Sequence, residues 1–306
     1  GTQGHGDVVA GTSTFTATNS TVAANGPQAI GLLLTSDTGT QSATMNGGSI
    51  TSAMGTAVGA DGGTANIQLT GTTVTGATNW LQVASSGTLL SSRSRTLHGV
   101  DPSLAPDAGN PPGVSSGGAL AGAVATANVL ARNATLSGAA ATEAGSTSNV
   151  TLIDSTWTLT GNSNLTNLVN DPSLIDFTPP QAGAYKTLTV RNYSGDGVIA
   201  LNTFLGTDNS PSDKLVIDGG SATGASQLRI KNTGGPGALT TASGIQVVEV
   251  VNGGVSGASA FALSGRAVAG PYEYRLYQGS AAAPTDQSWY LRSEKEPEPP
   301  PGPRVA

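Results

Sequence analysis

Short strand-sized segments recur along this chain at the spacing that successive coils of a solenoid need. Gly-Thr pairs begin at Gly39, Gly63 and Gly87, and in this 24-residue register Met45 matches Leu69 and Ile50 matches Val74. Farther along, NVLARNATLSG begins at Asn128, and NVTLIDSTWTLTG begins 21 residues later at Asn149. The segment ANIQLTGTTVTG at Ala65 is a third version of that unit. A period of about 20–25 residues, with one coil per repeat, indicates a solenoid.

The residue types favour an all-β fold, a right-handed parallel β-helix. Each strand pairs with its equivalent in the next coil, so Val, Ile, Leu, Met and Phe point inward and Thr, Ser and Asn point outward. Gly and Asn suit the left-handed corners between strands, and stacked Thr or Asn ladders satisfy polar groups between coils. A β-sandwich would show tight hairpin signals at regular intervals instead. We expect roughly ten coils, a rod about 50 Å long.

The repeats divide the chain into three parts. We expect N-terminal coils over residues 1–156, interrupted near 91–122 by a long loop, because SSRSRTLHGVDPSLAPDAGNPPGVSSGGALAG has four prolines and little periodicity. Residues 157–292 are predicted to continue the helix and close it with a hairpin cap. Residues 293–306, which contain EKEPEPPPGPR, form a Pro/Glu-rich linker in this interpretation.

Composition excludes several functional classes. The 306 residues include no cysteine, so disulfides and thiolate metal sites are absent. The net charge is −6 and no basic stripe occurs, so nucleic acid is not an expected partner. No apolar run approaches the roughly 18 residues of a membrane-spanning helix. Gly1 does not begin a signal peptide, and we therefore expect a mature or trimmed domain.

Large aromatic residues concentrate near the C-terminus. A solenoid exposes an apolar edge at each end, and terminal units must cover it. Since aromatic side chains bury much area, we predict that a structural cap uses Trp157, Tyr272, Tyr274, Tyr277, Trp289 and Tyr290.

Several segments in order resemble the terminal part of pertactin-like autotransporter passengers. These are STWTLTGNSNLTNLVNDPSLIDF from Ser155, YKTLTVRNYSGDGVIALNTFLGTDNSPSDKLVIDGG, and the closing PYEYRLYQ and SWYLRS. The resemblance implies a C-terminal autochaperone module that caps the helix and nucleates folding after export. It also implies type V secretion, tethering to an outer-membrane β-barrel, and a place on the cell surface or release from it. Neither an Arg-Gly-Asp tripeptide nor proline-rich repeats occur in the helical part, so an integrin-binding role is not implied.

Catalytic constellations are poorly represented. The two histidines, His5 and His98, have no positioned partner, and the chain lacks a G-x-S-x-G elbow. Asp37 begins an Asp-Thr-Gly triplet, but no second such triplet supplies the partner carboxylate of an aspartic protease, so a turn is expected there. Polysaccharide-cleaving β-helices need clustered carboxylates, whereas Asp37 and Asp61 are alone in their coils and Glu143 and Asp154 have no evident partner. We predict no enzyme activity, no cofactor and no metal.

The sequence favours an adhesin that binds a host surface protein, matrix or glycan through many weak polar contacts. One alternative is self-association between copies that aggregates bacteria, and a second is polysaccharide processing. Arg93, Arg95 and His98 are the candidate binding residues, a small basic patch on the predicted loop.

Overall fold

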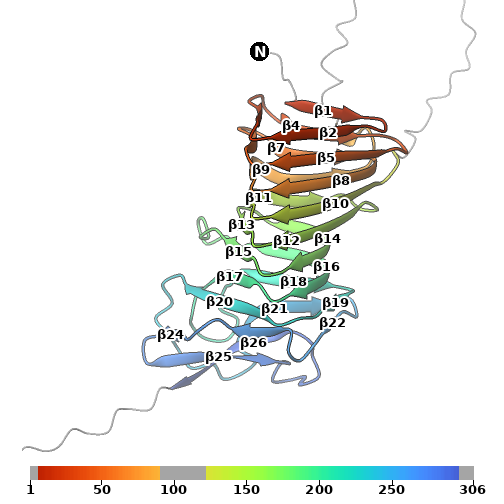
Figure 1. The fold of residues 1–306 in the computed structure, drawn as a ribbon. Helices are drawn as coiled ribbons and strands as arrows, with labels where there is room; N and C mark the ends of the chain where they lie inside the picture. The colour runs from red at the N-terminus through yellow and green to blue at the C-terminus, as the bar shows by residue number, and fades with distance from the viewer. Residues whose placement is uncertain (1–5, 90–121, 296–306) are drawn as a thin grey trace, which may run out of the picture.

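The strands stack into a solenoid along one axis (Figure 1). The structure is a computed structural model that describes residues 6–89 and 122–295. One sheet, sheet A, contains twelve strands: β1 (Asp7–Ala10), β3 (Thr21–Ala24), β4 (Ile30–Thr35), β6 (Ser49–Ser52), β7 (Thr56–Asp61), β9 (Thr73–Ala84), β11 (Thr135–Thr142), β13 (Thr156–Leu159), β15 (Leu174–Phe177), β17 (Val198–Thr203), β20 (Ser226–Asn232) and β23 (Phe261–Leu263).

The other sheet, sheet B, contains fourteen strands: β2 (Thr14–Thr18), β5 (Thr40–Asn46), β8 (Gly63–Thr70), β10 (Ala125–Arg132), β12 (Thr147–Ile153), β14 (Ser163–Asn170), β16 (Thr187–Gly195), β18 (Lys214–Asp218), β19 (Ser221–Ala222), β21 (Ile245–Val251), β22 (Val255–Ser256), β24 (Ala267–Ala269), β25 (Tyr272–Gln278) and β26 (Trp289–Lys295). Nine of these, from β2 to β21, follow one another in parallel register. Eight steps at the strand spacing give a stack about 38 Å long. The predicted parallel β-helix is confirmed.

Equivalent residues of successive coils lie directly above one another. In sheet B, Ala43, Ile67, Val129, Val150 and Leu168 pair in sequence and all point into the core. Because side chains alternate between the faces of a strand, this inward column fixes an outward column of polar residues beside it. Register and core are therefore specified by the same pattern.

The predicted repeat register is confirmed for two of its steps. Thr40 pairs with Thr64, Met45 with Leu69, and Ile50 with Val74. Asn128 pairs with Asn149, as the second repeat predicts. The third Gly-Thr pair was wrongly placed in the series, because the next-coil partner of Thr64 is Thr126 and not Thr88.

The misplaced repeat has a simple cause in the coil geometry. The 12-residue β9 covers two sides of its coil, since Thr73–Gly76 pairs with β6 whereas Leu81–Ala84 pairs with β7. Gly87 and Thr88 follow at a corner after β9. Ser86 and Ala123 meet at this corner, because Ser86 N donates to the Ala123 carbonyl at 2.8 Å and Ala123 N donates to Ser86 Oγ at 3.1 Å.

Sheet A has an unusual buried patch on its outer side. All six residues of β7 are buried, as are the first five of β4. Leu89 covers this patch and forms a small second cluster with Ile30, Leu33 and Ala84. The short segment after β9 therefore packs on the outside of the coils and leaves the interior unchanged.

The C-terminal end of the stack is closed by antiparallel strands. β26 pairs antiparallel with both β21 and β25, and β25 pairs with β24. These hairpins lie below the last coils in Figure 1. Antiparallel pairing interrupts the parallel edge on which another coil would stack. The predicted hairpin cap is confirmed.

Candidate functional site

A column of hydroxyl groups runs along the outer face of sheet A. We call it the hydroxyl ladder; it consists of the successively paired Thr21, Ser49, Thr73, Thr135 and Thr156, with Thr51, Thr75, Ser137 and Thr158 paired in a second row beside them. Each of these side chains is exposed or half-buried. The ladder presents neutral groups that both donate and accept hydrogen bonds, in two rows at the strand spacing.

A column of amides runs along the outer face of sheet B. We call it the asparagine ladder; it consists of Asn66, Asn128, Asn149, Asn167 and Asn192, in which each Nδ2 donates to the Oδ1 of the preceding asparagine at 2.9, 2.8, 2.7 and 2.8 Å. Asn192 Oδ1 then accepts from the backbone N–H of Ser221 at 3.1 Å. These bonds fix the side-chain rotamers, and the predicted polar ladder between coils is confirmed for asparagine.

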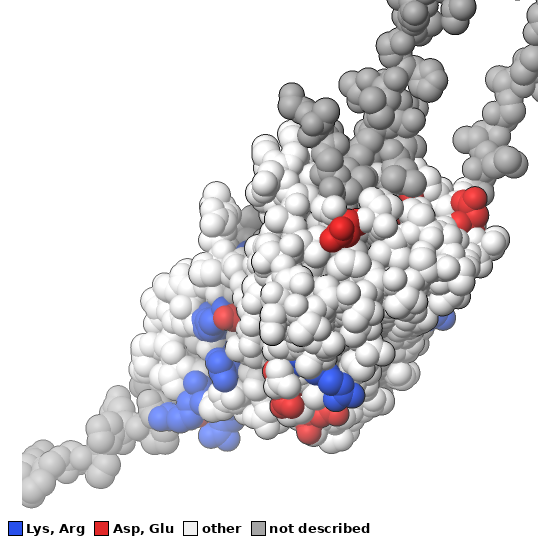
Figure 2. Space-filling view, turned by 45° about the horizontal axis from the view of Figure 1, so that its top comes forward, with Lys and Arg blue, Asp and Glu red and all other residues white. Residues whose placement is uncertain are grey.

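Charge is distributed unevenly along the stack. Between residues 6 and 161, the described charged residues are Asp7, Asp37, Asp61, Arg132, Glu143 and Asp154. The remaining described coils and the cap hold most of the Lys and Arg residues. Figure 2 shows a broad uncharged surface, with most of the blue side chains gathered toward the lower end of the view. The N-terminal coils thus offer partners a polar surface with few charges.

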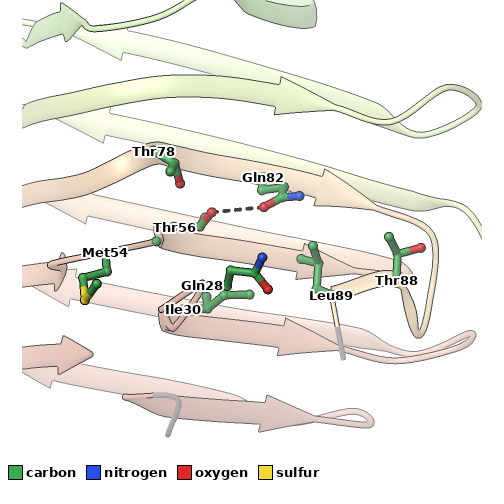
Figure 3. A pocket seen from close by; sticks show the side chains of 9 residues that line it. Gln28, Ile30, Met54, Thr56, Thr78, Gln82, Thr88 and Leu89 are labelled. Carbon is green, nitrogen blue, oxygen red and sulfur yellow. Dashed lines mark hydrogen bonds between the residues drawn. The ribbon is translucent and has the colours of Figure 1, made fainter. Parts of the chain in front are cut away.

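A groove opens beside the buried patch of sheet A (Figure 3). Its volume is about 310 Å³, and it is lined by Gln28, Ile30, Met54, Gly55, Thr56, Thr78, Gln82, Thr88 and Leu89. The Thr56 hydroxyl donates to Gln82 Oε1 at 3.0 Å. Met54 is 54% exposed at the rim, which is unusual for a large apolar side chain. The groove thus combines amide and hydroxyl groups with apolar walls.

The buried Asp61 holds the segment that covers this region. Its carboxylate accepts the backbone N–H groups of Gly87 and Leu89, each at 3.1 Å, and the Thr35 hydroxyl at 3.4 Å. Burial raises the pKa of Asp61 above its ordinary value, and these hydrogen bonds offset part of that effect. Asp61 therefore acts as a structural anchor for residues 87–89.

A second, polar cleft of about 510 Å³ lies on sheet B. It is lined by Thr142, Glu143, Ala144, Gly145, Ser146, Thr147, Asn164, Leu165, Thr166, Thr189, Arg191 and Asp218. The lining comes from the turn between β11 and β12 and from three consecutive strands, β14, β16 and β18. We call it the polar cleft.

The sequence-predicted binding residues Arg93, Arg95 and His98 lie outside the described residues, as does His5. Among the predicted cap residues, Trp157 lies in β13 within the coils. Its ring meets that of Trp80 edge to face at 5.8 Å, and its Nε1 donates to the Gly138 carbonyl at 2.9 Å.

The other predicted cap residues lie on the final hairpin. Tyr274, Trp289 and Tyr290 are buried, whereas Tyr272 and Tyr277 are half-buried. Trp289 contacts the Phe261 ring edge to face at 5.7 Å and donates to Ser256 Oγ at 2.8 Å. These contacts join the hairpin to the last coils.

The acidic residues do not assemble a recognisable catalytic centre. Asp37 lies exposed at the bend between β4 and β5. Asp171 and Asp196, which the sequence analysis did not single out, hydrogen-bond to each other, and this bond and the charge of Asp196 raise the pKa of Asp171, with a contribution from Asp154. All three are exposed at turns and line neither the groove nor the polar cleft.

The described residues contain neither a metal-binding cluster nor a membrane-spanning helix. Within residues 6–89 and 122–295, no group of three or more acidic or histidine side chains is arranged to hold a metal ion. No helix in the described part is both long enough and apolar enough to cross a membrane.

Comparison with known proteins agrees with this architecture. The family described as Autochaperone Domain Type 1 matches residues 163–276. Over 119 residues the chain is 44% identical to the Adhesin BmaC autotransporter of Brucella suis, covering 36% of this chain and 3% of that protein. Over 117 residues it is 39% identical to the Autotransporter adhesin AIDA-I of Escherichia coli, covering 38% of this chain and 9% of that protein.

The similarity extends to pertactin itself. Over 143 residues the chain is 32% identical to the Pertactin autotransporter of Bordetella bronchiseptica, covering 46% of this chain and 14% of that protein. The chain thus spans less than a sixth of the length of each of these three curated relatives. It is a pertactin-like autotransporter passenger with an autochaperone module, a region that lies outside the bacterial cell at the outer-membrane surface.

Proposed function

We propose that this passenger is a non-catalytic adhesin that binds a host surface protein, matrix or glycan. The observation that carries the proposal is the neutral, repetitive outer surface of the N-terminal coils, built from the hydroxyl and asparagine ladders. Two of the relatives are named adhesins. A single hydroxyl contact contributes little, but a rigid row of them, present in many copies on one cell, gives avidity.

Self-association is the second candidate, and the ladders favour it for a specific reason. Hydroxyl and amide groups are both donors and acceptors, so a ladder is complementary to a second copy of itself. In this alternative, passengers on neighbouring cells pair face to face and the bacteria aggregate.

The domain organisation belongs to the same proposal. Residues 1–156 provide binding coils, 157–292 provide the capping module, and 293–306 link to an outer-membrane barrel that tethers the passenger, although β26 extends the cap strand to Lys295, three residues past the predicted boundary. Since the antiparallel hairpin covers the last parallel coils, removal of residues 272–292 should make the remaining coils sensitive to protease. Retained resistance would contradict the capping role.

Display on a non-adherent laboratory bacterium tests the function. Attachment to epithelial cells without clumping supports a host adhesin, whereas clumping alone supports self-association. Introducing charge through Thr75→Lys on the hydroxyl ladder should abolish whichever contact uses that ladder. Thr18→Lys, at an exposed position of sheet B, is the matched control. Absence of both attachment and clumping would refute the proposal.

A further inference from the structure

The polar cleft has the features of a preorganised binding site. Its wall is the turn between β11 and β12, where Gly145 adopts φ +87°. Asn164 locks this wall, because its Oδ1 accepts from Thr142 N at 3.2 Å and its Nδ2 donates to the Thr142 carbonyl at 2.6 Å. The cleft is therefore held open by the fold itself.

Both carboxylates of the cleft are oriented through one oxygen each. Glu143 Oε2 accepts from Ser85 N at 2.6 Å, and Asp218 Oδ1 accepts from Asn252 Nδ2 at 2.5 Å. Within the described residues, the second oxygen of each carboxylate makes no hydrogen bond. Two acceptors are thus fixed in place and still available to a ligand.

Donors lie in the same cleft. The Arg191 guanidinium is exposed and makes no ion pair or hydrogen bond within the described ranges, although Asp218 lies on the neighbouring strand. The hydroxyls of Thr147 and Thr189 also lack partners among the described residues. An unpaired guanidinium fork and free hydroxyls suit a ligand with several adjacent oxygens.

We infer that the polar cleft binds a neutral saccharide. Arg191 and Asp218 lie on the neighbouring strands β16 and β18, so adjacent hydroxyls of one sugar can accept from the guanidinium and donate to the carboxylate. Glu143 lies at the other end of the cleft, beside the turn that precedes β12, and suits a further sugar unit of the same saccharide. Two carboxylates against one guanidinium leave the lining net negative, which disfavours acidic sugars and phosphates. The volume of about 510 Å³ lies within the range of small-molecule sites. No aromatic residue lines the cleft, so each copy binds weakly and attachment depends on many copies.

This inference deepens the proposed adhesin function and rests on it. The test is an array of neutral and acidic oligosaccharides, probed with the labelled 306-residue chain. We expect binding to neutral glycans, and a signal about tenfold lower for Arg191→Ala and for Asp218→Asn. The matched control is Arg132→Ala, which removes another exposed arginine of sheet B outside the cleft. Equal urea midpoints for all variants show that folding is intact.

The outcomes separate this site from the adhesin function. Binding to acidic glycans only, no binding at all, or an unchanged signal for Arg191→Ala overturns the saccharide site. If displayed cells still attach to host cells while the array result is negative, adhesion stands without this cleft. If the array binds but displayed cells do not attach, the cleft stands and the adhesin function fails.

Discussion

The hydroxyl of Tyr274 joins the closing hairpin to the coils, so Tyr274→Phe should weaken the capping module selectively. Tyr274 is fully buried in β25. Its hydroxyl donates to the Gly206 carbonyl at 2.8 Å and accepts from Ala238 N at 2.9 Å. A hydroxyl has one proton, so the 3.1 Å contact with the Ala238 carbonyl is an alternative to the bond with Gly206. Phenylalanine keeps the ring and removes both bonds.

The magnitude follows from the groups left without partners. A buried polar group that loses its only partner costs about 1–3 kcal/mol. Gly206 is buried, whereas Ala238 is half-exposed and water can replace part of its bond. We therefore expect a loss of about 2 kcal/mol in the free energy of unfolding of the capping module.

Urea unfolding followed by tryptophan fluorescence measures this effect. Trp289 reports on the hairpin, and Trp80 and Trp157 report on the coils, so variants that keep one reporter resolve where stability is lost. Tyr277→Phe on the same strand is the control, because its hydroxyl bonds the exposed Glu294 at 3.0 Å and should contribute less than about 1 kcal/mol. Equal losses for the two variants, or no loss for Tyr274→Phe, would refute the reasoning.

Three further predictions are open to the same unfolding assay. Asp213→Ala should cost about 3 kcal/mol or more, because the buried carboxylate accepts from Lys186 N at 2.7 Å and from both nitrogens of Asn202 at 2.9 and 2.6 Å; an unchanged midpoint would contradict this. Asn149→Ala removes two bonds of the asparagine ladder and should lower the free energy of unfolding by about 1–2 kcal/mol. An unchanged free energy of unfolding would show that hydrogen bonds to water replace the ladder bonds without loss. The third prediction concerns two aspartates whose pKa values are shifted in opposite directions. Burial raises the pKa of Asp61, so its stabilisation is full below about pH 4 and is lost as the pH rises through the folded pKa. Burial also opposes ionisation of Asp208, but three backbone N–H groups outweigh it and lower the pKa, so that stabilisation is lost as the pH falls below about 4. Asp61→Asn should remove the loss of stability on raising the pH above about 4, and Asp208→Asn should remove the loss on lowering the pH below about 4. If the two variants have the same pH profile of unfolding free energy, the opposite directions assigned to the two pKa shifts are wrong.

The alternation of apolar and polar residues was sufficient to predict the fold. Inward Met45 and Leu69 must stack to bury their side chains, and this places Thr40 above Thr64 without further information. The asparagine ladder follows from the same register. A period-two pattern therefore specifies the coil wherever one face is buried.

The repeat pattern does not predict the structure where coils change length or where strands such as β7 are buried on both faces. From Asn128 to Asn149, Asn167 and Asn192 the coils measure 21, 18 and 25 residues. The lengths differ because β13 has four residues where β11 has eight, and because the corner between β15 and β16 is longer than the one between β13 and β14. Glu143 and Asp218 come to line one cleft only after these unequal coils have been stacked. No fixed repeat predicts that meeting, and the acidic contact between Asp171 and Asp196 was missed for the same reason.

Because Ser86 and Ala123 are hydrogen-bonded to each other at one corner of the stack, we expect this corner to tolerate an inserted sequence. Strands β8 and β10, which precede and follow this corner in the chain, pair in continuous parallel register, and Asn128 Nδ2 donates to Asn66 Oδ1. Because the two ends already meet, lengthening the connection costs only about 0.6 kcal/mol for each doubling. A peptide epitope or small domain grafted between residues 90 and 121 should be presented on the bacterial surface while the stack stays intact, provided that Asp61 keeps its hold on Gly87 and Leu89. The protease resistance of the variant with the insertion, compared with that of the parent chain, measures whether the stack stays folded.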